Sequence, residues 1–351
     1  MDWAKHVTAI GNAQIALGRY DGMLKSIVNP TLLLSPLISQ EAVLSSQIEG
    51  TQASLADVLG FDADPVGEPE DPKNDDIKEV INYRSAIAYA TKKLETHPIS
   101  LNVIKELHAI LLNSVRGRSK SPGEFRTIQN YIGSPGAKME EATFIPPGPE
   151  IIMPCLDNWE KYVHFNEKDY IVQLAIVKAQ FEIIHPFLDG NGRIGRLLIP
   201  LFLYAKGILS SPMFYLSSYF ETNRQEYYDK LQAVSEKKDW DGWISFFLQA
   251  IIEQAEINIS KTGEILSLYE KMKIQIPELT SSQFAISAVD ALFGAPLLTT
   301  KSFIRKSEIH QSSAKRIVNI LRDNNIIIEI REAKGRTPAL YVFKELFEIV
   351  G

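Results

Sequence analysis

Apolar residues recur every three or four positions along most of this chain, as they do on the buried face of an α-helix. The pattern is regular between about residues 77 and 259, and the first sixty residues are also predicted to be helical. Two segments show the spacing well: Ile104, Leu107, His108 and Leu111, and then Leu174, Val177, Phe181 and Ile184. The chain is therefore predicted to be mainly α.

Two stretches depart from the helical spacing. Residues 130–150, NYIGSPGAKMEEATFIPPGPE, place a Ser-Pro-Gly turn signal between two short β-prone segments and predict a small β-hairpin. Residues 61–76, FDADPVGEPEDPKNDD, are rich in Pro, Asp and Glu and poor in apolar residues, which predicts an exposed loop. This loop would separate an N-terminal helical region, 1–60, from the main body, 77–259.

The pattern changes again near residue 277. Two short helical segments come first, and SSAKRIVNILRDN, 312–324, supplies a third. The segment IIIEIREAKGRTPALYVF, 326–343, then predicts a hairpin whose turn carries Lys334 and Arg336. Three helices followed by a hairpin with a basic tip predict a winged helix-turn-helix domain over 277–351.

Composition adds the class of protein but not its chemistry. With 351 residues the chain is long enough for two or three domains, and 45% hydrophobic with 23% charged residues is typical of a soluble protein. The formal net charge is −6, yet ten of the 37 Lys and Arg residues and only eight of the 43 Asp and Glu residues lie from Pro277 onward. A mildly basic C-terminal region allows contact with nucleic acid without requiring it.

The sequence also predicts a cytoplasmic location. The N-terminal segment MDWAKHVTAI lacks the basic and apolar regions of a secretory signal, and the apolar run from Leu197 is too short to span a bilayer, so no membrane contact is expected. The single cysteine, Cys155, cannot form an internal disulfide, which agrees with a reducing compartment, and we interpret it as a structural thiol.

The segment HPFLDGNGRIGR, residues 185–196, is the densest group of candidate functional residues. It contains the pattern G-x-G-x-x-G, which also occurs in dinucleotide-binding folds. That interpretation requires a strand before the glycines and an acidic residue about twenty positions after them, at the end of a second strand. Here the preceding segment has helical spacing and no such strand follows. We therefore reject a dinucleotide-binding fold.

The same residues are better explained as an anion site at the start of a helix. A helix that opens at Asn191 would direct its unpaired N–H groups at one point, and Arg193 and Arg196 lie in its first turns, where a cation without an anionic partner is disfavoured. Asp189 is a natural Mg²⁺ ligand beside phosphates, and His185 is placed to act as a general base. Each feature alone is usually a turn, a core residue or a solvated face, but their combination within twelve residues favours function.

This segment resembles the signature of the Fic family of AMP-transferring enzymes, His-Pro-Phe-x-Asp/Glu-Gly-Asn-Gly/Lys-Arg-x-x-Arg, at every fixed position. SPGEFRTIQNYIG, ATFIPPGPE and YYDKLQAVSEKKDWDGWISFFL extend the likeness over about 77–259. The resemblance implies a helical core with one hairpin, called the flap, and transfer of AMP from ATP to a hydroxyl of a target protein. It implies one role for each residue: His185 as the base, Asp189 as the Mg²⁺ ligand, Gly190, Asn191 and Gly192 as the anion hole, and Arg193 and Arg196 on the outer phosphates.

A second motif lies in the N-terminal region. SSQIEG places Ser45 and Glu49 four residues apart on one helical face, with Gly50 suited to end the helix. A solvated helix end is the ordinary explanation, although a carboxylate in the last turn is disfavoured by the helix dipole unless a cation approaches it. The stretch resembles the inhibitory motif of Fic proteins, Ser/Thr-x-x-x-Glu-Gly/Asn. That resemblance implies that Glu49 pairs with Arg196 and thereby misaligns ATP.

Several alternatives stay open at this level. The same scaffold would also suit removal of AMP from a modified target, transfer of another phosphate-containing group, or a nucleotide-sensing regulator that binds DNA through 277–351. The family suggests a homodimer, a flap that binds an extended segment of the target by strand addition, and a Ser, Thr or Tyr hydroxyl as acceptor. Tyr227 and Tyr228 would suit an adenine pocket, but paired tyrosines on a helix are more often core residues. No pair of histidines has zinc-ligand spacing, so no zinc site is expected.

Overall fold

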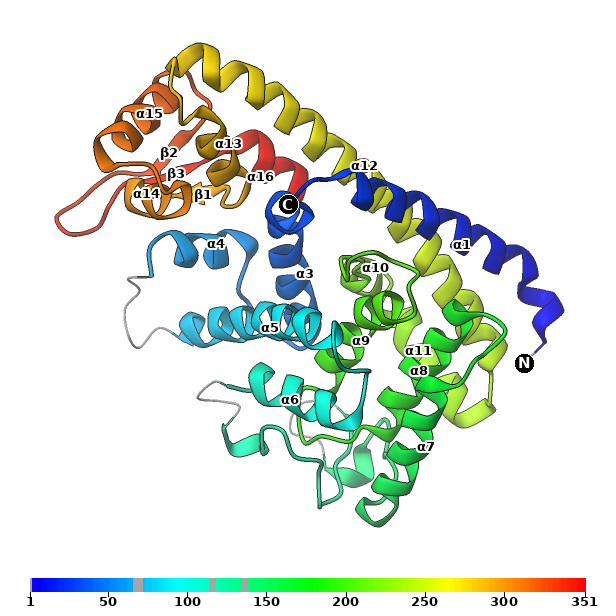
Figure 1. Cartoon of the computed structure of the whole chain (residues 1–351). Coiled ribbons are helices and arrows are strands. Elements are labelled where there is room, and N and C mark those ends of the chain that lie inside the picture. The colour runs from blue at the N-terminus through cyan, green and yellow to red at the C-terminus, as the bar shows by residue number, and fades with distance from the viewer. Residues whose placement is uncertain (1, 66–71, 114–117, 134–137) are drawn as a thin grey trace. The chain divides into compact units, whose positions relative to one another are not determined.

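The chain is mainly helical, as predicted, with one small three-stranded sheet (Figure 1). The computed structural model describes residues 2–65, 72–113, 118–133 and 138–351. Within this described part, no helix is both long enough and apolar enough to cross a membrane.

The elements follow one another in the order of their labels. The first half contains α1 (Trp3–Ser26), α2 (Pro30–Leu33), α3 (Ser35–Ile48), α4 (Leu55–Ala63), α5 (Pro72–Leu94), α6 (Leu101–Leu111), three 3₁₀ turns η1 (Arg118–Lys120), η2 (Met139–Glu141) and η3 (Pro149–Ile151), α7 (Ile152–His164) and α8 (Tyr170–Ile184). The second half contains α9 (Asn191–Ala205), α10 (Ser217–Thr222), α11 (Arg224–Lys237), α12 (Trp240–Thr280), α13 (Ala285–Phe293), β1 (Leu297–Leu298), α14 (Thr300–Ser307), α15 (Gln311–Asp323), β2 (Ile328–Arg331), β3 (Leu340–Val342) and α16 (Lys344–Val350).

The chain forms two compact units, each assembled from separated segments. One unit combines residues 1–24, 44–50 and 82–256, and the other combines 25–43, 51–81 and 257–351. The sequence suggested three consecutive regions, whereas α12 contributes residues to both units and continues through Pro277. Pro277 lies three residues before the end of this helix and cannot donate to the carbonyl of Lys273, so the helix continues there without one of its hydrogen bonds.

The first unit has α8 and α9 at its centre, packed against each other. Ten of the fifteen residues of α8 are buried, and Asp169 caps its start by accepting hydrogen bonds from the N–H groups of Ile171 and Val172, both 2.9 Å. Buried indole N–H groups of Trp159 and Trp243 donate to carbonyls of α8. This packing fixes the end of α8, after which the signature segment begins.

Two local predictions need correction. In 130–150 the described residues pair at one isolated antiparallel bridge, Ile132 with Phe144, in place of two strands, and the carbonyls of Pro146 and Pro147 accept hydrogen bonds from the side chains of Gln129 and Arg126; the Ser-Pro-Gly turn lies outside the described residues. In the loop predicted over 61–76, α4 extends to Ala63 and α5 begins at Pro72, so both described ends are helical; the middle of the stretch, 66–71, lies outside the described residues. Proline and acidic residues also suit the first turn of a helix, which the composition alone does not distinguish from a loop.

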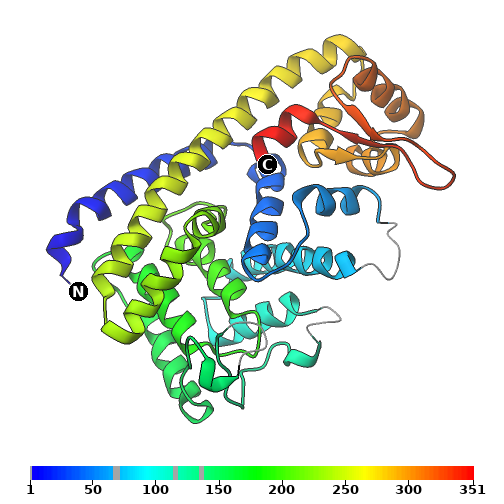
Figure 2. The same cartoon turned by 180° about the vertical axis from the view of Figure 1, so that it is seen from behind.

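The second unit contains the three helices and the hairpin expected near the C-terminus. Its sheet has the order β1-β3-β2 with antiparallel pairs, Leu298 opposite Tyr341 and Ile328 opposite Val342. The turn between β2 and β3 includes Gly335 at φ 59° and extends beyond the sheet (Figures 1 and 2). The interpretation of this region as a winged helix-turn-helix stays a prediction.

Candidate active site

The signature segment connects α8 to α9 through a tight loop. His185 is the C-cap of α8 and adopts the left-handed conformation, φ 48° and ψ 60°, so the chain turns sharply at this residue. Gly190 precedes α9 at φ 78°, a conformation that glycine adopts without strain, and the backbone is what requires glycine here, because a Cβ atom would make only ordinary van der Waals contact with His108 and Leu111. The helix then begins at Asn191, where the sequence placed it.

The loop is held by Asn191 and by a histidine from α6. The side chain of Asn191 accepts from the N–H of Phe187 (2.9 Å) and donates to its carbonyl (2.8 Å), so it fixes the loop in addition to the anion-hole role expected of it. His108 Nδ1 accepts from the N–H of Gly123 (2.9 Å), which leaves Nε2–H to donate to the carbonyl of Asp189 (3.0 Å). Burial lowers the pKa of His108 to about 4, so the ring is neutral.

Arg126 connects the same loop to the flap and was not anticipated. Its guanidinium is buried and donates to the carbonyls of His185 (2.9 Å), Ile128 (3.1 Å) and Pro147 (2.5 Å). One side chain, that of Arg126, therefore holds the backbone of the candidate catalytic histidine and the backbone at both ends of the flap. The only signal in the sequence is an arginine inside SPGEFRTIQNYIG, and nothing in the local spacing names its partners.

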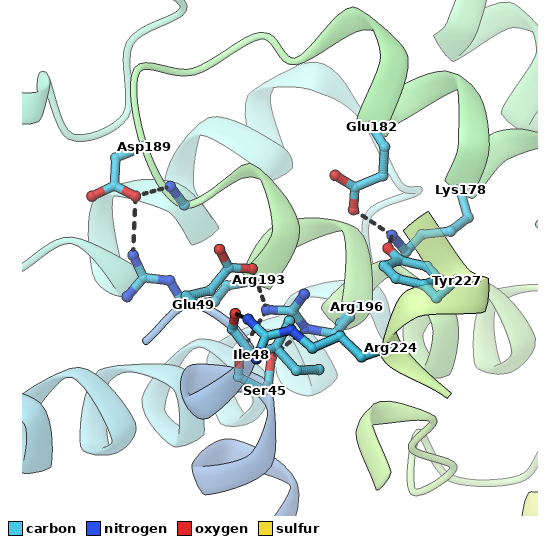
Figure 3. A network of polar contacts seen from close by, with 11 residues as sticks. Ser45, Ile48, Glu49, Lys178, Glu182, Asp189, Arg193, Arg196, Arg224 and Tyr227 are labelled. Atoms are coloured by element: carbon cyan, nitrogen blue, oxygen red, sulfur yellow. Dashed lines mark hydrogen bonds and ion pairs between the residues drawn. The ribbon is translucent and has the colours of Figure 1, made fainter. Parts of the chain in front are cut away.

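Arg196 is enclosed by the end of α3. Its Nε donates to the hydroxyl of Ser45 (2.8 Å), and its Nη2 donates to the carbonyl of Ser45 (2.7 Å) and forms an ion pair with Glu49 (2.6 Å; Figure 3). Burial opposes ionisation of Glu49, but Arg196 holds the pKa of this carboxyl below its ordinary value, with support from Arg193. The pairing that the resemblance implied is present.

Glu49 also lies directly against the start of α9. A Cβ atom at Gly192 would collide with the Glu49 carboxylate, so this glycine leaves the space that the carboxylate fills. Glu49 was expected in the last turn of the helix, but α3 ends one residue before it, at Ile48. Gly50 follows at φ 100°. Ser45 is fully buried beneath Arg196.

Asp189 and Arg193 form a looser pair on the other side of the loop (Figure 3). Asp189 Oδ1 accepts from the N–H of Gly190 (2.6 Å) and lies 3.4 Å from Arg193 Nη2, and the side chain of Asp189 is 45% exposed. No cluster of three metal-ligating side chains occurs in the described part of the chain. A Mg²⁺ ion would fit here only with Asp189 as a single protein carboxylate completed by phosphate oxygens and water, which is a common way for this ion to bind.

A cavity of about 620 Å³ opens beside the start of α9. Four of the candidate site residues line it, namely Glu49, His185, Gly192 and Arg196; the cavity wall does not include the other six, which are Ser45, Gly50, Asp189, Gly190, Asn191 and Arg193. The remaining lining residues come from the flap, from α8 and from α11: Tyr131, Ile132, Gly133, Thr143, Phe144, Glu182, Ile183, Tyr227, Tyr228, Leu231, Gln232 and Ser235.

The imidazole of His185 lies at the wall of this cavity. Burial lowers the pKa of its imidazole below the ordinary 6.5, while Glu182 partly offsets this effect. Its Nδ1 lies 3.3 Å from the carbonyl of Glu182, a contact that favours a proton on Nδ1 and leaves Nε2 to accept one.

Sequence reasoning missed a charged pair on α8, Lys178 and Glu182, of which Glu182 lines the cavity. Lys178 is fully buried and donates to Glu182 and to the hydroxyl of Tyr227 (2.8 Å). Tyr227 stacks on Phe220 at 4.6 Å between ring centroids, so it is both a core residue and part of the cavity wall, whereas Tyr228 is partly exposed. The sequence did contain a signal for this buried pair, because a lysine and a glutamate four residues apart interrupt an otherwise apolar helix.

Comparison with known protein families gives two matches. Residues 7–92 match the Fic/DOC family N-terminal model, and residues 98–203 match the Fic/DOC family model. Among curated proteins, the protein adenylyltransferase fic-1 of Caenorhabditis briggsae is 30% identical over 135 residues, which is 37% of this chain and 24% of the relative. The protein adenylyltransferase Fic of Aedes aegypti is 27% identical over 251 residues, 70% of this chain and 44% of the relative. The chain therefore spans less than half the length of these relatives.

Solved structures support the fold. A Fic family protein from Desulfovibrio desulfuricans superposes with a TM-score of 0.56 at 19% identity, covering 95% of each chain. Fic-1 of Caenorhabditis elegans, residues 134–508, gives the same TM-score at 22% identity and covers 73% of this chain and 72% of that one.

Proposed function

The chain belongs to the Fic/DOC family, since its two family models together match more than half of the 351 residues, and from this premise we propose that it is a protein adenylyltransferase. It would transfer AMP from ATP to a Ser, Thr or Tyr hydroxyl of a target protein, as the names of its relatives suggest. One observation carries the proposal furthest: a neutral histidine and a buried arginine line the same cavity where a helix begins.

The residues of this cavity divide the work of the transfer. The backbone N–H groups at the start of α9 and the guanidinium of Arg196 suit the phosphates, because both offer donors to oxygen anions. His185 Nε2 takes the proton of the target hydroxyl as its oxygen attacks the α-phosphorus. The bond from that phosphorus to the bridging oxygen breaks, AMP stays on the target and pyrophosphate leaves.

Asp189 would hold Mg²⁺ against the triphosphate. When bound, this ion neutralises phosphate charge and orients the leaving group. Asp189 itself is positioned by its bond to the N–H of Gly190 and by the His108 contact with its carbonyl.

The flap would bind the target protein. Large apolar side chains that are exposed to solvent gather in this part of the chain: Ile128, Tyr131, Ile132, Met139, Ile145, Ile151 and Met153. Backbone groups near the isolated bridge would pair with an extended target segment, while the apolar side chains contact its residues.

We further propose that the protein inhibits itself through Glu49. With Arg196 held by Ser45 and Glu49, the γ-phosphate lacks its arginine, and ATP would bind in a geometry unsuited to transfer. The observation in support is that one guanidinium accounts for three contacts with α3.

Parallel reactions with ATP labelled at the α- or γ-phosphate test the function. Retention of the α-label on protein is expected, and loss of that label on longer incubation with Mg²⁺ would identify removal of AMP as a second activity. Retention of the γ-label alone would contradict AMP transfer and identify a phosphotransferase.

Replacing Asp189 by alanine should weaken the dependence of ATP binding on Mg²⁺. The ion would lose its single protein carboxylate and keep only phosphate and water ligands. The measurement is the affinity for ATP at a series of Mg²⁺ concentrations. Asp189→Asn keeps the size of the side chain and removes its charge, so it separates the two effects. Coincident Mg²⁺ curves for the mutant and the unmodified protein would remove Asp189 from the metal site.

A specific observation favours a second candidate function, binding of duplex DNA by 277–351. Lys315 and Arg316 are exposed on α15, and Lys334 and Arg336 are exposed on the turn between β2 and β3. Within the described residues, none of these four side chains has an ion-pair partner. We expect Lys315→Ala with Arg316→Ala to weaken binding of a mixed-sequence duplex and to lower the slope of log K against log salt by about 2. The matched control is Lys344→Ala on α16, and equal slopes for all proteins would contradict DNA contact by α15.

A further inference from the structure

The carboxyl end of α3 is held by a second arginine in addition to Arg196. Arg224 Nη2 donates to the backbone carbonyl of Ile48, at 2.6 Å, and Ile48 is the last residue of the helix (Figure 3). The last carbonyls of a helix have no partner within it and need a donor from elsewhere. Arg224 supplies that donor at the residue immediately before Glu49.

Electrostatics favours this contact on both sides. Arg224 is the first residue of α11, where the helix dipole disfavours a cation, whereas the end of α3 carries the negative pole that attracts one. Glu221 is the nearest acidic partner, with 3.8 Å between the charged atoms, which is too long for a hydrogen bond. Among the described residues, the carbonyl of Ile48 is therefore the closest acceptor of this guanidinium.

Arg224 lies outside the nucleotide-binding machinery. It does not line the cavity, its side chain is 46% exposed, and its described contacts are with Ile48 and Glu221. Its helix also supplies the cavity wall, because Tyr228 and Leu231 lie one and two turns further along α11. Removal of this side chain would change how firmly α3 is held without removing a phosphate ligand.

We propose that Arg224 is a positioning residue that holds the end of α3 so that Glu49 stays on Arg196. The inference rests on the self-inhibition proposed above and deepens it: the strength of inhibition is set by two arginines, Arg196, which lines the cavity, and Arg224, which does not. The contact is a charge-assisted hydrogen bond at a partly exposed site, so its loss should raise AMP transfer by about threefold to tenfold.

A cycle of four proteins tests the proposal: the unmodified chain, Arg224→Ala, Glu49→Gly and the double mutant. The rate of α-label transfer should rise in Arg224→Ala, and the same substitution should have no effect once Glu49 is absent. Arg224→Lys, which restores a charged donor, should bring part of the inhibition back. Lys230→Ala, on the same helix and outside the cavity, is the matched control and should leave the rate unchanged.

Hydrogen exchange of the amides in residues 46–50 provides a readout besides activity. These amides should exchange faster in Arg224→Ala than in the control, with the thermal midpoint showing that both proteins are folded. If Glu49→Gly raises transfer but Arg224→Ala changes neither transfer nor exchange, the positioning role is wrong and self-inhibition stands. A rise in both backgrounds would place Arg224 in the nucleotide site instead. No rise with Glu49→Gly would overturn self-inhibition and this inference together.

Discussion

Replacing Glu49 by glycine should raise the rate of AMP transfer by about tenfold or more. The substitution removes the only acidic partner described for Arg196 and frees its Nη2 for the γ-phosphate, and one charge-assisted hydrogen bond is worth that factor. Aligning the triphosphate also places the α-phosphorus for in-line attack. The measurement is the initial rate of α-label incorporation at saturating ATP and Mg²⁺.

The sign of the pH effect follows from the same ion pair. Because Arg196 lowers the pKa of Glu49, the carboxylate stays ionised at neutral pH and inhibition should persist there. It should weaken only as the pH falls through that lowered pKa, and Glu49→Gly should lose this dependence. A helix end that is simply solvated predicts no change in rate.

The control for this prediction is Arg196→Ala, alone and combined with Glu49→Gly. Both proteins should be inactive, because the arginine is the inhibitory partner and the phosphate ligand at once, so the two substitutions should be strongly non-additive. Equal labelling by the unmodified protein and Glu49→Gly at every Mg²⁺ concentration would eliminate self-inhibition while leaving the transferase proposal in place.

His185→Ala should lower the rate of transfer by about 10²–10⁴, the usual contribution of a positioned base, and leave ATP affinity nearly unchanged. The imidazole would contact the incoming hydroxyl and not the triphosphate, and its backbone carbonyl, which accepts from Arg126, survives the substitution. Rate and affinity measured separately, by labelling and by calorimetry, distinguish a base from a structural residue.

The pH profile of the unmodified protein gives a second check on His185. Burial lowers the pKa of the imidazole below 6.5, so the neutral form should persist under mildly acidic conditions and activity should fall only as the pH drops through the lowered pKa. A fall centred at or above 6.5 would contradict the assignment. Loss of ATP binding in His185→Ala would make the residue structural.

The sequence predicted the parts of the site whose chemistry is local. A helix start was predicted from the glycines, Asn191 and the two arginines. This worked because the N–H groups, the helix dipole and the cations all act within a few residues of one another. The expectation for Glu49 came from the likeness to a family motif, since nothing in the residues alone identifies a partner 147 positions away.

The parts that were missed depend on distant contacts. Arg126 and Arg224 bond to backbone carbonyls, which every residue possesses, so no residue type in the sequence marks the acceptor. His108 fits the apolar spacing of α6 and gives no sign that its ring supports the loop at Asp189. The flap was predicted as a hairpin because β-prone residues flank a turn, whereas its described residues pair at a single bridge, and the carbonyls of Pro146 and Pro147 accept from the side chains of Gln129 and Arg126.

The space above Gly192 has a consequence for how such sites diversify. The carboxylate of Glu49 fills the volume that a Cβ atom at this position would need, so a side chain at position 192 would require this carboxylate, the end of a flexible side chain, to shift. The signature allows lysine as well as glycine at this position, and a chain with lysine there would hold the glutamate in a different place against the helix start. The residue at position 192 would thus set how much room this form of restraint has, independently of whether α3 is present.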